Sequence, residues 1–240
     1  HLAHGGVAHE GEVATRLGLP AVPEVAETVA LLGILELARS TGARVHIARL
    51  STARGVALVA AAKAEGLPVT CDVGVHHLHL CDRDAADFNA HMNLVPPLRG
   101  QADRDALRRG LADGTIDAVC SDHTPVDDDA KLVPFGEAEP GATGLELLLP
   151  LVLKWGGEMK LALPAALAAA TSRAAAILGV QAGSLAPGAP ADLCLFDPER
   201  PWRVTREALA SQGRNSPFLG YELAGRAVAT IVGGRVVYPA

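Results

Sequence analysis

Helix-like and strand-like patterns of apolar positions alternate along the first half of the chain. A helical pattern opens at Pro23 and stops at Gly42. Its apolar residues share one broad face: Val25, Val29, Leu32, Leu35 and Leu37. The segments that follow predict strand, helix, strand, helix and strand, at residues 44–50, 53–65, 69–75, 104–112 and 116–120. Ser51 or Thr52 is suited to cap the helix expected at residues 53–65. The alternation indicates parallel βαβ units in an α/β fold.

The pattern changes after a segment rich in Gly and Pro at residues 183–190. Before it, residues 144–155 and 161–178 are helical, and residues 1–19 are aperiodic, so we expect a loop there. Beyond it, short strands are expected at residues 192–196, 202–204, 227–232 and 235–238. We therefore predict two parts, an α/β part over residues 1–182 and a small all-β domain over residues 183–240.

Composition narrows the class of protein. The 240 residues are 49% hydrophobic and 20% charged, which is typical of a globular domain with a large core. The net charge of −6 argues against nucleic acid or an anionic membrane surface as partner. No apolar segment approaches the length of a membrane span. Four cysteines without CxxC spacing indicate a reduced, cytoplasmic protein.

The strand at residues 116–120 leads directly into Ser121-Asp122-His123. Strand alternation gives Asp122, His77 and Arg49 similar places at the ends of their strands, and we expect the three side chains to face one rim of the sheet. A His and an Asp there would form half of a metal site. The alternative is an Asp–His or Asp–Arg pair that satisfies buried polar groups.

The remaining polar clusters are weaker candidates. We expect the other histidines to be structural or exposed; the ones nearest the strands are His46, His76, His79 and His91. The acidic run at residues 127–129 lacks the Gly and Glu of a calcium loop, so it predicts a solvated loop.

An ordered series of motifs makes the sequence resemble the C-terminal part of a dihydroorotase, in the hydantoinase-related class of the amidohydrolase superfamily. The series comprises Gly11-Glu12 with Arg16-Leu17-Gly18-Leu19, Val45-His46-Ile47 with Ser51-Thr52, His76-His77-Leu78, Pro96-Pro97-Leu98-Arg99, Asp113-Gly114-Thr115-Ile116-Asp117-Ala118 leading to Ser121-Asp122-His123, Gly144-Leu145-Glu146, and Gly188 with Ala191-Asp192-Leu193.

The resemblance implies the second half of a metal-dependent (β/α)8 barrel of the TIM type, followed by part of a small β-domain. It implies an enzyme of de novo pyrimidine biosynthesis that interconverts dihydroorotate and N-carbamoyl-aspartate. Zinc would polarise the carbonyl group and supply hydroxide. Asp122 matches the family's general base, and His77 matches a metal-binding histidine.

Three substitutions depart from the family pattern. Arg49 stands where a metal-binding histidine is expected, and a guanidinium has no lone pair to give to zinc but pairs well with Asp122. Val95 and Val126 replace a substrate-binding Asn and His.

Three functions stay open. The first is a degenerate dihydroorotase-like chain without zinc that acts as a scaffold and associates with aspartate transcarbamoylase. The second is an active zinc-dependent dihydroorotase or related cyclic amidase with a reorganised site. The third is another metal-dependent hydrolase of the superfamily, in which Arg49 binds an anionic substrate.

The chain begins at His1 and contains what look like the last four of eight strand units. Half a barrel leaves an open sheet edge and an uncovered core. We expect these residues to belong to a longer protein that forms a homo-oligomer, and not to fold by themselves.

Overall fold

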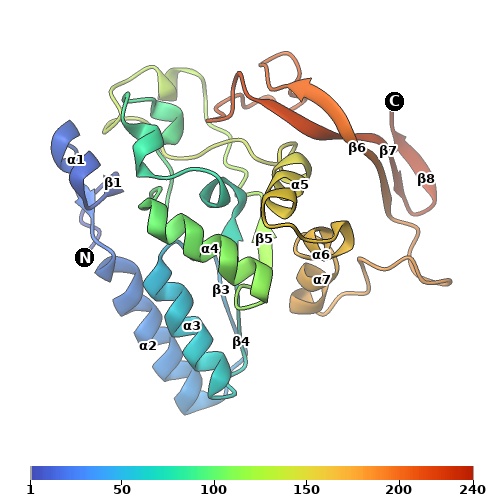
Figure 1. Ribbon diagram of the computed structural model, residues 1–240, viewed down its shortest axis with the longest axis horizontal. Helices are drawn as coiled ribbons and strands as arrows, with labels where there is room; N and C mark the ends of the chain where they lie inside the picture. Colours follow the sequence, from blue (N-terminus) through green and yellow to red (C-terminus); the bar gives the residue numbers. More distant parts are fainter. Residues whose placement is uncertain (1, 240) are drawn as a thin grey trace.

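A three-stranded parallel sheet forms the centre of the molecule. The computed structural model describes residues 2–239, so His1, at the start of the predicted loop, and Ala240 lie outside the described residues. The sheet order is β3 (Val45–Ile47), β4 (Val69–Gly74) and β5 (Ala118–Cys120). Helices α2 (Val25–Thr41), α3 (Ala53–Ala64) and α4 (Gln101–Asp113) lie in a row beside the sheet (Figure 1). The predicted parallel strand–helix units are therefore present.

The helix boundaries follow the expected signals. The Thr52 side chain accepts a hydrogen bond of 2.9 Å from the Gly55 amide and caps α3. Gly42 and Gly114 end α2 and α4 with positive φ angles of 68° and 87°. Glycine adopts this left-handed backbone without steric cost, so both stops are encoded locally.

The N-terminal segment is not the loop that its composition suggests. It contains β1 (Ala8–His9), α1 (Glu12–Leu17) and β2 (Ala21–Val22), and β1 pairs in parallel with β2. Elements this short carry too few residues to show a period, and isolated helices of this length are unstable without tertiary packing. The prediction of a loop over residues 1–19 is thus wrong for the described part of that segment.

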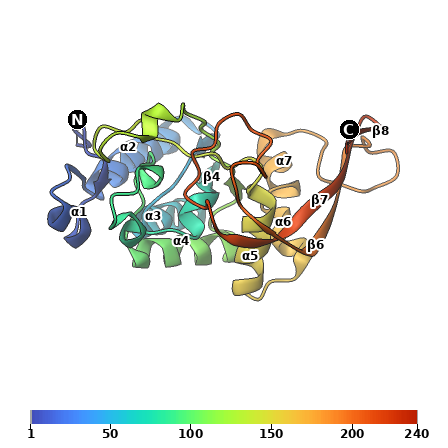
Figure 2. The ribbon, with the colours of Figure 1, turned by 90° about the horizontal axis from the view of Figure 1, so that it is seen from above.

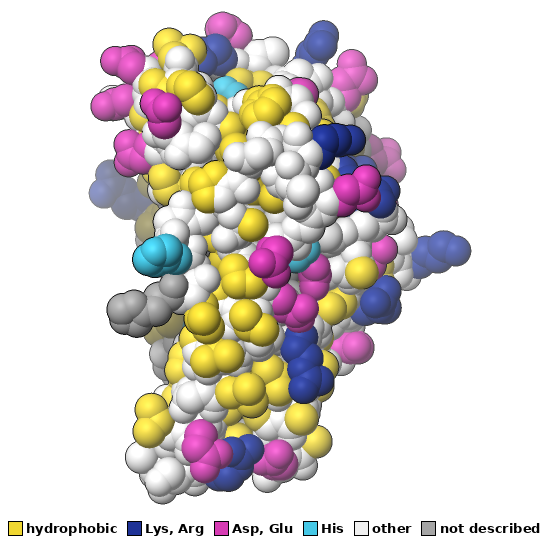
Figure 3. Space-filling model, turned by 90° about the vertical axis from the view of Figure 1, so that its left-hand side faces the viewer, with side chains coloured by type: hydrophobic (Ala, Val, Ile, Leu, Met, Phe, Trp, Pro, Cys, Tyr) yellow, Lys and Arg dark blue, Asp and Glu magenta, His cyan; other side chains and the backbone are white. Residues whose placement is uncertain are grey.

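The predicted apolar face of α2 is also wrong in its orientation. The buried residues are Thr28, Leu31, Leu35 and Ala38, which form a continuous helical stripe. Val25, Val29, Leu32 and Leu37 are 49–67% exposed. Figure 3 shows the side of the molecule on which α2 runs, and hydrophobic side chains gather in its lower part. Because α2 is apolar on nearly all sides, periodicity could not tell which side meets the core.

The C-terminal half begins with three short helices, α5 (Leu148–Glu158), α6 (Leu163–Ala168) and α7 (Ser172–Leu178). An antiparallel sheet follows, in the order β6 (Leu193–Arg203), β7 (Glu222–Val232) and β8 (Arg235–Tyr238). The two strands expected at residues 192–196 and 202–204 are one strand, β6, whose pairing with β7 is irregular between Asp197 and Pro201. Figure 2 shows this sheet extending away from α2, α3 and α4.

The core crosses the predicted boundary between the two parts. Val204, Phe218 and Leu223 belong to the same buried cluster as the residues of β4 and α4. A Cβ placed on Gly225 of β7 would lie 2.4 Å from Leu153 of α5, so strand and helix are in direct contact. The division at residues 182 and 183 stays a prediction. No helix among residues 2–239 has both the length and the apolar character needed to cross a bilayer.

Candidate functional site

Arg49 and Asp122 lie just beyond the carboxyl ends of β3 and β5, with φ angles of 58° and 45°. Non-glycine residues adopt this left-handed backbone only when neighbouring contacts hold them there. The Arg49 amide donates to Asp72 Oδ1 at 2.8 Å, which ties this turn to β4. Both residues therefore leave the strand geometry at the rim of the sheet.

The Arg49 guanidinium forms an ion pair with Asp122. Its Nη1 lies 3.3 Å from Asp122 Oδ1 and donates to the Val95 carbonyl at 2.9 Å. The predicted Arg49–Asp122 pair is thus confirmed. The Arg49 side chain is 44% exposed and that of Asp122 is 11% exposed, so solvent screens the pair and its net contribution is about 0–1 kcal/mol.

His77 reaches the same place by a different route from the expected one. The register pairs Ile47 with Cys71 and Asp72 with Ala118, so strict alternation would place His77 and Asp122 on opposite sides of the sheet. The three side chains do meet at one rim, as expected, but strand alternation is not what brings His77 there. The alternation ends at Gly74, because Val75–Leu78 form a 3₁₀ turn, η1, that redirects His77.

One ring nitrogen of His77 has a clear partner and the other has none. Nε2 lies 3.0 Å from the Pro96 carbonyl, which accepts a hydrogen bond, so Nε2 carries the proton. Nδ1 then has a lone pair, and it is buried without a partner among the described residues. Burial lowers the pKa of His77, with the Pro96 carbonyl and the charge of Asp122 acting against this shift. The ring is therefore neutral.

Gly74 packs closely against both of these groups. A Cβ at this position would lie 3.2 Å from His77 Nδ1 and 3.6 Å from Asp122 Oδ2. Any side chain at residue 74 would crowd the imidazole and the carboxylate. Glycine therefore allows the two groups to lie close to the end of β4.

A polar network fixes the turn after Arg49. The Glu27 carboxylate of α2 accepts hydrogen bonds of 2.5–3.0 Å from the amides and hydroxyls of Ser51 and Thr52. Arg99, which is 3% exposed, donates to Ser51 Oγ and to the Val22 carbonyl. Sequence reasoning missed Glu27 because its partners are 24 and 25 residues away and no local spacing connects them.

Of the substituted positions Val95 and Val126, Val95 contacts the pair, and neither offers a polar side chain. Val95 is 56% exposed and contributes only its carbonyl, to Arg49. The Val126 amide donates to Asn215 Oδ1 at 3.2 Å. Their assignment to former substrate positions stays a prediction.

The other predicted histidines and the acidic run have structural surroundings. His46 lies 2.9 Å from both Thr70 Oγ1 and Asp72 Oδ2. His123 Nδ1 accepts from the amides of Gly144 and Leu145 and so holds the loop opposite it. Residues 127–129 are exposed, as expected for a solvated loop.

The described residues do not fit a zinc ion at this site. Structural and catalytic zinc sites use at least three protein ligands. Among residues 2–239, no three His, Cys, Asp or Glu side chains are arranged to hold a metal ion. Within residues 2–239, the candidate donors here are His77 and Asp122, and the permanent charge of Arg49 beside the same carboxylate would repel a divalent cation.

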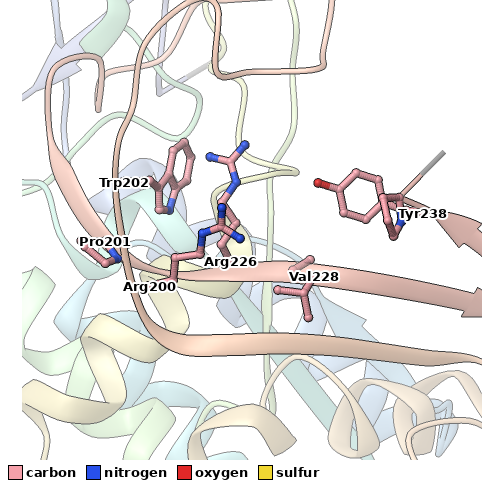
Figure 4. Close-up of a pocket in the computed structure, with 8 residues that line it drawn as sticks. Arg200, Pro201, Trp202, Arg226, Val228 and Tyr238 are labelled. Carbon is pink, nitrogen blue, oxygen red and sulfur yellow. The ribbon is translucent and has the colours of Figure 1, made fainter.

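A second polar cluster lies on the antiparallel sheet (Figure 4). Arg200, Trp202, Arg226 and Tyr238 line a groove there, and the Arg226 guanidinium lies 4.6 Å from the centre of the Trp202 ring. None of its eight lining residues is a His, Cys, Asp or Glu, so the groove has none of the side chains that most often bind metal ions.

The burial of His76, next to the site, predicts that the fold loses stability in acid. It is fully buried and stacks on Phe218, and burial, together with the nearby His77, lowers its pKa to about 3; His79 and His123 add to this effect. The unfolded chain takes up a proton below pH 6.5 and the folded chain does not. Stability therefore falls by about 1.4 kcal/mol per pH unit as the pH drops below that value.

Unfolding of the wild type between pH 6 and pH 5 should take up about one more proton than unfolding of the His76→Phe variant. The free energy of unfolding of the variant should therefore fall less steeply with decreasing pH. Urea titrations at several pH values measure this slope. His4→Asn is the matched control, because His4 is exposed and Asn tolerates its positive φ. Equal slopes for His76→Phe and the wild type would contradict the assignment.

The chain resembles known proteins both in sequence and in structure. A model described as "Amidohydrolase family" matches residues 5–237. A "Dihydroorotase-like protein" of Pseudomonas aeruginosa is 46% identical over 99% of this chain and 56% of its own length. A "Dihydroorotase" of Geobacter sp. (strain M21) is 43% identical over 98% of this chain and 55% of its own length. The chain thus spans little more than half the length of these relatives. Among solved structures, L-hydantoinase (dihydropyrimidinase) from Arthrobacter aurescens superposes with a TM-score of 0.86 at 30% identity, over 98% of this chain and 52% of that one.

Proposed function

The chain belongs to the amidohydrolase family, and from this premise we propose that it is part of a dihydroorotase-like protein whose metal site no longer functions. The observation that carries the proposal is the Arg49–Asp122 ion pair. A positive side chain pairs with the carboxylate that corresponds to the family's general base. Such a site has a built-in cation where the enzymes of the family use a metal.

The relatives support a proposal for the wider setting of the chain. We propose that the residues form the second half of a (β/α)8 barrel with part of a small β-domain, within a cytoplasmic, oligomeric protein of pyrimidine biosynthesis. The outer face of α2 supports a larger fold, since Val25, Val29, Leu32 and Leu37 are 49–67% exposed there and such an apolar patch is normally covered. The proposed role is that of a scaffold, with aspartate transcarbamoylase as its partner.

An active enzyme is the second candidate. It is supported by His77 and Asp122, whose side chains both lie beside Gly74, and by relatives named dihydroorotase. In such an enzyme, Asp122 would accept a proton and His77 would donate its Nδ1 lone pair to zinc. Zinc would supply the activation of water and of the carbonyl group.

Metal analysis of the full-length protein separates the two candidates. We expect less than one equivalent of zinc after purification and no hydrolysis of L-dihydroorotate. Arg49→His should not restore turnover, because Val95 and Val126 also replace polar side chains at the predicted substrate positions. One or more equivalents of bound zinc, with turnover abolished by Asp122→Asn, would establish the active enzyme instead.

A further inference from the structure

We propose that the groove on the antiparallel sheet binds a small phosphomonoester that carries a planar ring. The groove is lined by two arginines and two aromatic residues among others, and its volume of about 450 Å³ is enough for a ligand of that size. None of its lining residues belongs to the Arg49–Asp122 site. The inference is therefore independent of whether that site binds zinc.

The two arginines of the groove have no anionic partner among the described residues. Neither the Arg200 nor the Arg226 guanidinium takes part in a side-chain hydrogen bond or an ion pair within residues 2–239. Asp197 faces Arg226 in the strand register, but its Oδ1 accepts hydrogen bonds from the amides of Glu199 and Arg200 at 3.0 and 3.2 Å. Two positive charges that line one groove repel each other, so an anion that enters between them is attracted by both.

Local contacts hold the groove in shape. The Trp202 indole donates to the Gly225 carbonyl at 3.1 Å, and the Arg226 guanidinium lies 4.6 Å from the centre of the indole ring. A cation over an aromatic face is attracted to the ring, which holds Arg226 in place. The hydrogen bond from the Arg200 amide to Asp197 fixes the irregular part of β6 from which Arg200 projects. Less conformational entropy is therefore lost when a ligand binds.

The donors of the groove fit a phosphate group better than a carboxylate. A phosphomonoester carries about two negative charges at neutral pH and three acceptor oxygens, and two guanidinium groups match both. A carboxylate has two oxygens, which one guanidinium can satisfy alone. Figure 4 shows Trp202 and Tyr238 on either side of the two guanidinium groups, with the Tyr238 hydroxyl turned toward them. That hydroxyl is a further donor for a phosphate oxygen.

A neighbouring cavity indicates what the rest of the ligand is like. Its volume is about 400 Å³, and it shares Arg226 and both aromatic residues with the groove. Leu149 and Pro150 of α5 add apolar surface to its lining. The carboxylate in its lining, that of Glu146, already accepts hydrogen bonds from two backbone amides. Apolar and aromatic surface beside the arginines favours a ring attached to the phosphate over free phosphate.

The test is calorimetric titration of phenyl phosphate into the full-length protein at low ionic strength and about pH 7.5, where the phosphate is a dianion. We expect saturable binding that weakens about tenfold in Arg200→Gln and in Arg226→Gln, the loss of a charge-assisted hydrogen bond in each. Arg235→Gln is the matched control, because Arg235 is exposed on the same sheet outside the groove, and it should bind as the wild type does. Inorganic phosphate, which lacks the ring, and benzoate, which lacks the phosphate, should each bind more weakly.

Three results would overturn the inference. The first is absence of phenyl phosphate binding to the full-length protein, as follows if another part of that protein covers the groove. The second is affinity that is unchanged in Arg200→Gln and Arg226→Gln, or that falls equally in Arg235→Gln and so reports only the net charge. The third is binding of benzoate or of inorganic phosphate that is as tight as that of phenyl phosphate.

Discussion

Replacing Glu27→Ala should lower the free energy of unfolding by about 3–5 kcal/mol, the range for breaking a buried charged network. The carboxylate accepts hydrogen bonds from both amides and both hydroxyls of Ser51 and Thr52, so its removal leaves these groups without their acceptor. Arg99 is buried beside this network, and its pKa is lowered by burial while the charge of Glu27 opposes that shift. Without Glu27, the guanidinium loses its largest nearby compensating charge.

Guanidinium chloride denaturation of the full-length protein measures this effect. Glu36→Ala is the matched control on the same helix, because Glu36 pairs only with Arg39 and its side chain is 73% exposed. We expect a change of about 1 kcal/mol or less there. A similar midpoint shift for both variants would show that the network around Ser51 adds no particular stability.

Replacing Trp155→Ala should cost about 3–5 kcal/mol, as expected for truncating a fully buried aromatic side chain. Trp155 on α5 has no exposed surface and belongs to the continuous core. Its indole Nε1 donates to the Arg108 carbonyl of α4 at 3.3 Å, so it joins two helices. The alanine variant loses this bond and leaves a cavity between them.

Thermal unfolding followed by circular dichroism at 222 nm checks the Trp155 prediction. Leu178→Ala serves as control, because Leu178 is a large apolar residue that is 75% exposed. That change should stay within about 0.5 kcal/mol of the wild type. Equal destabilisation of the two variants would contradict the packing described for α5.

The strands and helices around the site were predictable because each has a local signal. Thr52 caps α3 and Gly114 ends α4, and these signals need no knowledge of the rest of the fold. The orientation of α2 was not predictable in the same way. Both of its sides are apolar, and only the tertiary contacts of Leu31 and Leu35 decide which side is buried.

The candidate site also combines features that have a local sequence signal with features that depend on tertiary contacts. Arg49 and Asp122 follow strand-like segments, and opposite charges at the carboxyl ends of two strands of one sheet made their pairing predictable. Their left-handed backbones and the 3₁₀ turn that redirects His77 were not, since alternation within a strand carries no information about where the strand stops. Glu27 acts on residues distant in sequence, and Gly74 acts through the absence of a side chain. Neither effect leaves a local pattern in the sequence. The catalytic and metal roles assigned to Asp122 and His77 stay predictions.

The Arg49–Asp122 pair also changes how the site depends on its surroundings. A bound metal ion is exchanged with the medium, so chelators, acid and the metal supply of the cell all set how much of a metalloprotein is loaded. A guanidinium is joined to the chain by covalent bonds and keeps its proton at every physiological pH. The positive charge that balances Asp122 is therefore part of the polypeptide, with one guanidinium for each Asp122 carboxylate.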